Sequence, residues 1–176
     1  MNALVVYESV YGNTRAVAQA IAEGLGGAQV VPVRSGSSHL EGNELLIVGG
    51  PTHIHGLATA RSRQAAVEAV QEDGVAEVEP GATEEPGLRA WLQDLPERDS
   101  AVAAAFDTRM DKSPWVTGDA SRGIAKRLRR RGYEVIGTES FLVEHSEGPL
   151  EEGELERARA WGAELAQSVP STERQT

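Results

Sequence analysis

The opening of the chain constrains its fold more than any other feature. An apolar run at residues 3–7 leads directly into a short polar loop at residues 8–14, and a helical pattern follows. The run contains no polar alternation, so we expect a strand buried on both faces, as strands of parallel sheets are. A buried strand, a tight loop and a helix in this order predict an α/β fold.

The same alternation of strand and helix patterns continues almost to the end of the chain. Besides the first strand at about residues 2–7, we expect strands at about 28–33, 44–50, 101–106 and 133–143, and helices at 13–26, 62–72, 88–95, 121–131 and 153–167. These elements predict a parallel sheet with helices on both faces. We expect residues 1–168 to form one domain, with a flexible acidic insertion at about 73–87 and a disordered tail at 169–176.

The polar loop after the first strand has the composition of a phosphate site. Ser9, Tyr11 and Thr14 offer hydroxyl donors, Gly12 allows a tight turn, and the following helix adds a favourable potential for an anion. The loop contains no Lys and matches neither GxxxxGK[ST] nor GxGxxG. Neutral donors suit a single terminal phosphate monoester better than a triphosphate with magnesium. The simpler alternative is a polar turn whose Asn13 or Thr14 caps the helix.

Two short motifs resemble those of a known family. The pattern Ser9-x-Tyr11-Gly12-Asn13-Thr14 resembles the phosphate loop of flavodoxins and flavodoxin domains, and Gly-Gly-Pro-Thr at 49–52 is similar to that family's Gly-x-Pro-Thr motif. The resemblance implies a three-layer sandwich around a five-stranded parallel sheet of order 2-1-3-4-5. It also implies flavin mononucleotide (FMN) as the cofactor, bound beyond the carboxyl ends of the strands.

By the same resemblance, three loops at these strand ends hold the cofactor. The first binds the phosphate, the second contacts the ribityl chain and one face of the ring, and the third holds the ring edge. The cofactor-binding residues so implied are Ser9, Val10, Tyr11, Gly12, Asn13, Thr14, Pro51, Thr52, His53, Ile54, His55, Gly56, Asp107, Thr108, Arg109 and Trp115. Flavodoxins often place an aromatic side chain in the second loop, where this chain has none.

The charges in and beside the two ring loops predict a redox property. Cations outnumber acids in these segments: the cations are Arg61, Arg63, Arg109 and Lys112, and the acids are Asp107 and Asp111. Cations favour an anionic reduced flavin, so we expect a less reducing couple than that of a low-potential flavodoxin.

Composition narrows the range of partners and locations. The net charge of −10 disfavours nucleic acid and anionic membranes as partners. The sequence contains no run of eighteen apolar residues, so we expect no membrane span. The expected N-terminal strand leaves no room for a signal peptide, and we therefore expect a cytoplasmic location. His53 and His55 have no neighbouring Cys or carboxylate cluster, and we expect no metal site. The basic run at 126–131 indicates a solvated helix face, with docking of an acidic partner as the second interpretation.

Three functions agree with these patterns. The first is an FMN protein that carries electrons to or from a partner protein or a small-molecule donor or acceptor. The second is an NAD(P)H:quinone or protoporphyrinogen-type oxidoreductase of the same architecture, although no catalytic acid or base stands out. The third is an interaction domain that has lost its flavin. The sequence does not indicate an oligomeric state.

Overall fold

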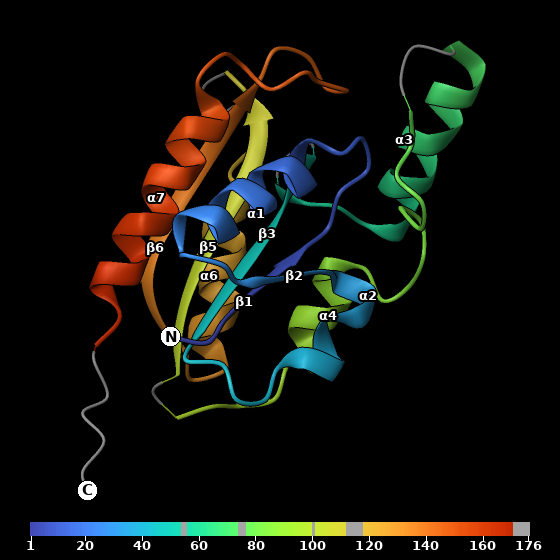
Figure 1. The fold of residues 1–176 in the computed structure, drawn as a ribbon. Coiled ribbons are helices and arrows are strands. Elements are labelled where there is room, and N and C mark those ends of the chain that lie inside the picture. The colour runs from blue at the N-terminus through green and yellow to red at the C-terminus, as the bar shows by residue number, and fades with distance from the viewer. Residues whose placement is uncertain (54–55, 74–76, 100, 112–117, 171–176) are drawn as a thin grey trace, which may run out of the picture.

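The computed structural model describes residues 1–53, 56–73, 77–99, 101–111 and 118–170. Its centre is a parallel sheet with the order β2-β1-β3-β5-β6 (Figure 1). The strands are β1 (Ala3–Tyr7), β2 (Gln29–Pro32), β3 (Leu45–His53), β5 (Val102–Met110) and β6 (Glu134–Val143). This arrangement confirms the expected order 2-1-3-4-5 of the five parallel strands. A two-residue strand that the sequence analysis did not predict, β4 (Gly56–Leu57), pairs antiparallel with the end of β3.

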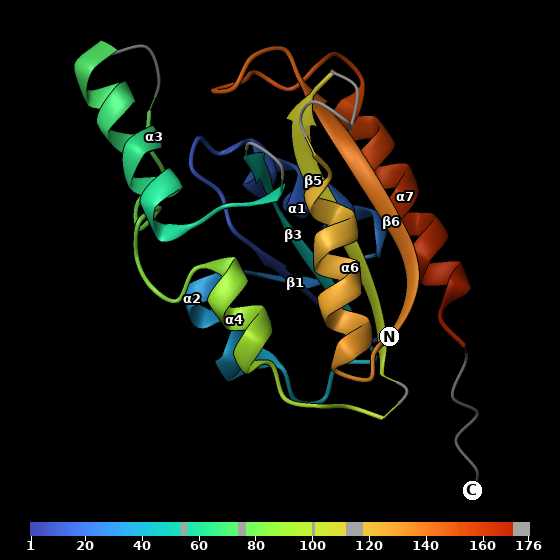
Figure 2. The same cartoon turned by 180° about the vertical axis from the view of Figure 1, so that it is seen from behind.

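Helices cover both faces of the sheet, which confirms the three-layer α/β class. Helices α1 (Asn13–Gly24) and α7 (Glu154–Ser168) pack on one face. On the other face lie α2 (Val33–Gly36), the short 3-10 helix η1 (Ser37–His39), α4 (Leu88–Asp94) and α6 (Ala120–Arg130) (Figure 2). Helix α3 (Ala60–Asp73) stands away from the sheet, beyond the carboxyl ends of the strands (Figure 1).

The strands separate two hydrophobic cores. Along β1, Leu4 and Val6 face the α4–α6 side, and Val5 faces the α1–α7 side. The alanines of β5 are fully buried, and their small side chains let helices approach the sheet closely. A Cβ on Gly162 would lie 2.3 Å from the Ile21 carbonyl oxygen, so the contact of α7 with α1 requires glycine there. The apolar runs that predicted the strands therefore also form the cores.

The acidic segment before α4 contacts the rest of the chain through ion pairs. Within residues 77–87, Glu79 pairs with Arg15 at 3.0 Å and Glu84 pairs with Arg34 at 3.2 Å. The Glu79 N–H also donates to the Val10 carbonyl at 2.8 Å. The single domain, the flexibility of the 73–87 segment and the disorder of the tail stay predictions. No helix in the described ranges is both long enough and apolar enough to cross a membrane.

Candidate functional site

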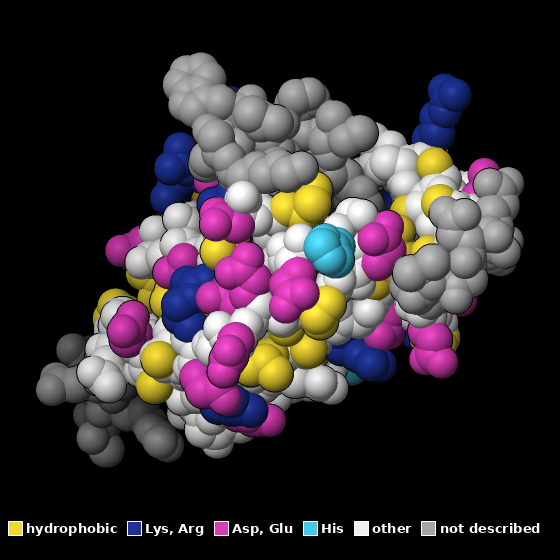
Figure 3. Space-filling view, turned by 90° about the horizontal axis from the view of Figure 1, so that it is seen from above, with side chains coloured by type: hydrophobic (Ala, Val, Ile, Leu, Met, Phe, Trp, Pro, Cys, Tyr) yellow, Lys and Arg dark blue, Asp and Glu magenta, His cyan; other side chains and the backbone are white. Residues whose placement is uncertain are grey.

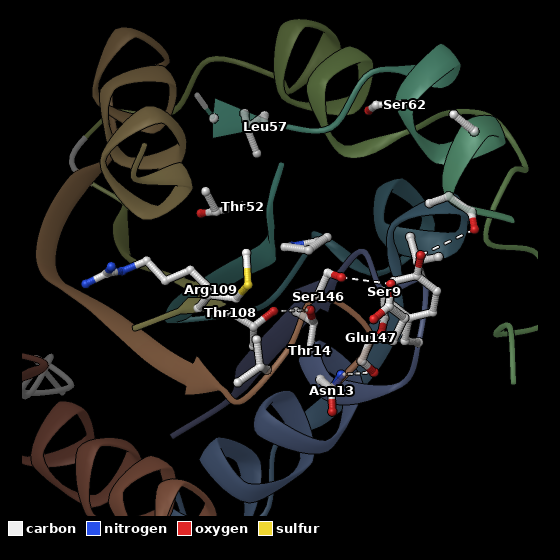
Figure 4. A pocket seen from close by; sticks show the side chains of 18 of the residues that line it. Ser9, Asn13, Thr14, Thr52, Leu57, Ser62, Thr108, Arg109, Ser146 and Glu147 are labelled. Atoms are coloured by element: carbon white, nitrogen blue, oxygen red, sulfur yellow. Dashed lines mark hydrogen bonds between the residues drawn. The ribbon is translucent and has the colours of Figure 1, made fainter. Parts of the chain in front are cut away.

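A cavity of about 700 Å³ lies at the carboxyl ends of β1, β3 and β5 (Figure 4). This is the edge where parallel α/β sheets bind their ligands. Three groups of residues form its walls, namely the loop after β1, the ends of the neighbouring strands and one face of α3. The lining residues are Ser9, Val10, Tyr11, Asn13, Thr14, Pro51, Thr52, Gly56, Leu57, Thr59, Ser62, Ala65, Ala66, Ala69, Arg89, Thr108, Arg109, Met110, Val143, Ser146 and Glu147.

The loop after β1 leaves the start of α1 open toward the cavity. Gly12 precedes the helix in a left-handed conformation, with φ of 88°, and no side chain in the described part of the chain caps the helix. The Gly12 N–H donates to the Ser9 hydroxyl oxygen at 3.0 Å, and this hydrogen bond closes the turn. Gly12 holds the capping position, so the capping by Asn13 or Thr14 that the simpler alternative assumed is wrong. The backbone N–H groups of the first helical turn are therefore available to an anion.

Hydroxyl and amide groups surround this helix start. Thr14 is buried, and its hydroxyl shares a hydrogen bond of 2.7 Å with the hydroxyl of Thr108 on β5. The Asn13 side-chain amide donates to the Glu147 carbonyl at 3.0 Å, which brings the loop after β6 against the loop after β1. Figure 4 shows Ser9, Asn13 and Thr14 gathered at one end of the cavity, with the Arg109 guanidinium at the other end.

The ends of β3 and β5 are joined by a buried carboxylate that does not line the cavity. Asp107 has no exposed surface, and it accepts hydrogen bonds from the Thr52 hydroxyl and, at 2.8 Å, from the Ala120 N–H at the start of α6. Burial raises the pKa of the Asp107 carboxyl above its usual value, and the hydrogen bonds from Thr52 and Ala120 oppose this rise. Asp107 thus holds Thr52 and α6 in place and does not itself line the cavity.

The third wall of the cavity is a face of α3 composed of small residues. Ser62, Ala65, Ala66 and Ala69 lie at helical spacing and line the cavity. The Tyr11 hydroxyl donates to the Ala66 carbonyl at 3.3 Å, so the loop after β1 contacts this wall directly. Our sequence analysis predicted the helix but did not assign it to the site. The spacing of its small residues was the signal that could have indicated a wall close to a planar ligand.

A buried ion pair attaches α3 to β1. Arg63 is 2% exposed, and its guanidinium lies 3.2 Å from Glu8 and 2.5 Å from Glu85. Glu8 also accepts the Leu88 N–H at 2.8 Å. Burial raises the pKa of Glu8, whereas the Leu88 N–H and Arg63 oppose this rise. The sequence analysis counted Arg63 among cations that act on a flavin, but the structure uses its charge to balance these two carboxylates.

The charged groups that do line the cavity are Arg89, Arg109 and Glu147. Arg89, which the sequence analysis did not assign to the site, donates from Nη2 to the Leu57 carbonyl at 2.9 Å and so fixes β4. Arg61 is exposed and does not line the cavity. Lys112, which the same analysis counted, lies outside the described residues. Among the described residues, Arg89 and Arg109 are therefore the cations that line the cavity, and Glu147 is the acid.

The structure brings most of the expected cofactor residues together. The lining residues include Ser9, Val10, Tyr11, Asn13, Thr14, Pro51, Thr52, Gly56, Thr108 and Arg109 from our sequence analysis. Gly12 shapes the loop, and Asp107 lies behind the cavity. Ile54, His55 and Trp115 lie outside the described residues, and His53 is described only as a backbone position of β3. The analysis missed the α3 face, Leu57, Thr59, Arg89, Met110, Val143, Ser146 and Glu147.

The sheet order defines a doubly wound α/β protein with a cavity at the carboxyl edge of its sheet, and comparison with known proteins specifies its family. The flavodoxin family model matches residues 5–161, so the chain belongs to the flavodoxin family. This confirms the resemblance that the two short motifs indicated. No curated protein matches the chain in a sequence search.

Solved structures share the fold at low sequence identity. An archaeal flavodoxin is 20% identical with a TM-score of 0.60, over 96% of this chain and 99% of that one. Flavodoxin 2 from Bacillus cereus is 18% identical with a TM-score of 0.63, over 95% and 99%. A Fusobacterium nucleatum flavodoxin bound to flavin mononucleotide is 15% identical with a TM-score of 0.58, over 96% and 99%. The family assignment makes this chain a flavin-binding electron-transfer protein, and neither the oxidoreductase nor the flavin-free domain is favoured.

Proposed function

We propose that the flavin of this electron-transfer protein is FMN, with its phosphate at the start of α1. The observation that carries the proposal is the uncapped first turn of α1, which opens into the cavity between Ser9, Asn13 and Thr14. Backbone N–H groups, hydroxyls and an amide bind a phosphate monoester without a lysine or a metal ion. The 700 Å³ cavity that continues from this end is within the usual range for cofactor sites.

The residues around the cavity divide the work of holding the cofactor. The loop after β1 binds the phosphate, and Pro51, Thr108 and Met110 border the space toward the ring. The small residues of α3 cover the opposite side and exclude water from it. FMN supplies the one-electron chemistry when bound, and the protein supplies its orientation and electrostatic environment. The cytoplasmic location and the choice between a protein and a small molecule as electron donor or acceptor stay predictions.

A titration of flavin-free protein tests where the phosphate binds. FMN and riboflavin share the same ring, so the ratio of their dissociation constants isolates the phosphate. We expect FMN to bind more tightly than riboflavin, and Ser9→Ala and Thr14→Val each to lower this preference for FMN about 10-fold to 100-fold, because each removes a hydrogen bond to a charged group. Quenching of flavin fluorescence measures each constant.

The matched control is Ser62→Ala, which removes a hydroxyl from the α3 wall of the same cavity. We expect it to leave the FMN-to-riboflavin ratio unchanged. Equal affinities for FMN and riboflavin in the unmodified protein would overturn the assignment of the phosphate site. A dinucleotide flavin that binds more tightly than FMN would overturn the choice of cofactor.

A further inference from the structure

Arg63 carries a buried charge beside the cavity, which it does not itself line. Of the Lys and Arg residues in the described part of the chain, Arg63 alone is buried. Figure 3 shows Asp and Glu side chains spread over the end of the molecule where the cavity lies. An arginine on that surface could pair with a carboxylate and keep most of its hydration. Burial of this guanidinium is therefore a feature that the surrounding charges do not require.

Three segments of the chain meet at the Arg63 guanidinium. Nη1 lies 3.2 Å from Glu8, directly after β1, and Nη2 lies 2.5 Å from Glu85, shortly before α4. The other carboxylate oxygen of Glu85 accepts the Gly87 N–H at 2.8 Å. A Cβ on Gly87 would collide with Nη1, so glycine leaves the room that the guanidinium occupies. The segment before α4 and the end of β1 thus enclose one side chain of α3.

A buried ion pair of this kind is a costly way to attach a helix. Removing two charges from water costs free energy that their attraction repays only when the remaining polar atoms also find partners. Glu8 Oε1 and Arg63 Nε have no hydrogen-bond partner among the described residues. Apolar side chains of similar volume often give equal or greater stability. What the ion pair adds is a defined position, because a planar guanidinium fits its carboxylates in few geometries.

That position determines where the α3 wall of the cavity stands. Arg63 lies in the first turn of α3, the helix whose small residues form this wall. Glu8 directly precedes Ser9, which lines the cavity from the loop after β1. Figure 1 shows α3 apart from the helices that cover the sheet. The ion pair therefore fixes the separation between the α3 wall and the loop after β1.

We propose that Arg63 and Glu8 are a positioning pair, which holds the α3 wall against the ring of the bound flavin. This inference rests on the flavin site proposed above, because the ring must lie between the sheet and α3. Neither Arg63 nor Glu8 lines the cavity, so the pair acts on the flavin through the small side chains of α3. Close apolar cover on that side stabilises the bound ring.

The main test removes both buried charges at once. Glu8→Gln with Arg63→Met leaves neither partner charged and keeps an acceptor for the Leu88 N–H. We expect FMN and riboflavin each to bind at least about 10-fold more weakly, because the ring loses close contact with α3. The preference for FMN over riboflavin should stay within about twofold, because the phosphate site and α3 make independent contributions. Quenching of flavin fluorescence measures both constants.

Two measurements on flavin-free protein separate the position of α3 from the stability of the fold. The urea midpoint of the double variant should lie above that of the unmodified protein or no more than about 0.5 M below it, because both charges are removed together. Hydrogen exchange should be at least about 10-fold faster in α3, at residues 60–73, and unchanged in α1 and α7. These measurements need no cofactor, so they test the attachment of α3 independently of the choice of FMN.

Two further variants sharpen the result. Arg63→Lys keeps the charge but not the planar group that joins two carboxylates, so its loss of flavin affinity should be smaller than that of the double variant. The matched control is Arg34→Met, because Arg34 pairs with Glu84 in the same acidic segment at 3.2 Å but is exposed. We expect this control to change either flavin affinity less than about twofold.

Unchanged flavin affinities in the double variant would overturn the proposal. A loss confined to FMN would overturn it too, because the pair would then act on the phosphate and not on the ring. Faster exchange throughout the molecule with a lower urea midpoint would make the ion pair a contact for folding only. If the unmodified protein bound neither flavin, the proposed function itself would fail, whereas faster exchange confined to α3 would still support its attachment by Arg63.

Discussion

Helices α1 and α6 both begin at the carboxyl edge of the sheet, but the chain completes only one of these starts by itself. At α6, Asp107 accepts the Ala120 N–H at 2.8 Å and Asp119 accepts the Arg122 N–H at 3.0 Å. At α1, glycine occupies the capping position and the first turn has no acidic residue. The positive end of the α6 dipole therefore has two carboxylates beside it, whereas the first turn of α1 contains no acidic residue.

The starts of α3 and α4 follow the pattern of α6. Thr59 and Ser62 exchange hydrogen bonds at the start of α3, at 3.1 and 2.8 Å. Glu8 accepts the first N–H of α4. Polar side chains therefore accept the first N–H groups of α3, α4 and α6, whereas Gly12 occupies the same position at α1. An uncapped helix start beside a cavity can bind an anion, which supports the proposed position of the phosphate.

The largest expected effect follows from giving α1 an anion of its own. In Ser9→Asp a carboxylate would lie about 4 Å from the phosphate of the ligand, at the start of α1. At an effective dielectric constant of about 20, this repulsion costs about 4 kcal/mol, or about 1,000-fold in FMN affinity. The same carboxylate should stabilise the flavin-free protein by about 0.3–1 kcal/mol, because it favours the helix dipole.

Fluorescence titration with FMN and urea denaturation of flavin-free protein measure the two effects. Ser9→Asn is the control, because it has nearly the same shape as the Asp variant and no charge. We expect it to keep most of the affinity that Ser9→Asp loses. If the two variants bound FMN equally, the phosphate would not lie at the start of α1, and the comparison of the two helix starts would lose its functional meaning.

The sequence was sufficient where local patterns determine the structure. The apolar run of β1 and the hydroxyls with Gly12 lie within a single short segment, and they predicted both a buried strand and the open turn before α1. The apolar runs that became β3 and β5 likewise predicted two buried strands, whereas the strand order came only from the family resemblance. Each of these features depends on neighbouring residues and on periodicity, which a single sequence contains.

The parts that could not be predicted depend on contacts between distant residues. Arg63 was interpreted as a cation near the flavin because nothing local shows that it pairs with Glu8, which lies 55 positions earlier. Asp107 was counted as a cofactor residue because its position after a strand is the same whether it faces the ligand or the start of α6. The α3 wall depends on how the helix is attached, and that attachment is the buried ion pair of Arg63.

A smaller effect is expected from removing the anion that the chain supplies to α6. Asp107→Ala leaves the buried Ala120 N–H and Thr52 hydroxyl without this acceptor, which should cost about 1–3 kcal/mol of unfolding free energy. Urea denaturation at neutral pH measures it. A loss below about 0.5 kcal/mol would show that the helix start does not need this carboxylate.

The pH dependence of Asp107 has a definite sign. Its pKa is raised in the folded protein, so the native state binds more protons than the unfolded state above the unfolded pKa of about 3.9. Its contribution to stability is therefore fully present below that pH and falls as pH rises toward the folded pKa. Asp107→Asn has no such group, so the stability of the unmodified protein relative to this variant should decrease as the pH rises. An increase would contradict the burial of Asp107 as the cause.

The smallest effect concerns the second carboxylate at α6. Asp119 accepts hydrogen bonds from the Arg122 N–H and, at 2.6 Å, from the Ser121 hydroxyl, so Asp119→Ala should cost about 1 kcal/mol, the usual value for a lost helix cap. Asp119→Asn keeps an acceptor and should cost less. Neither variant should change FMN affinity more than about twofold, because the ligand's phosphate is assigned to α1 and not to α6. A larger change in that affinity would mean that the two helix starts act on the same ligand, and the contrast between an occupied and an open start would have to be abandoned.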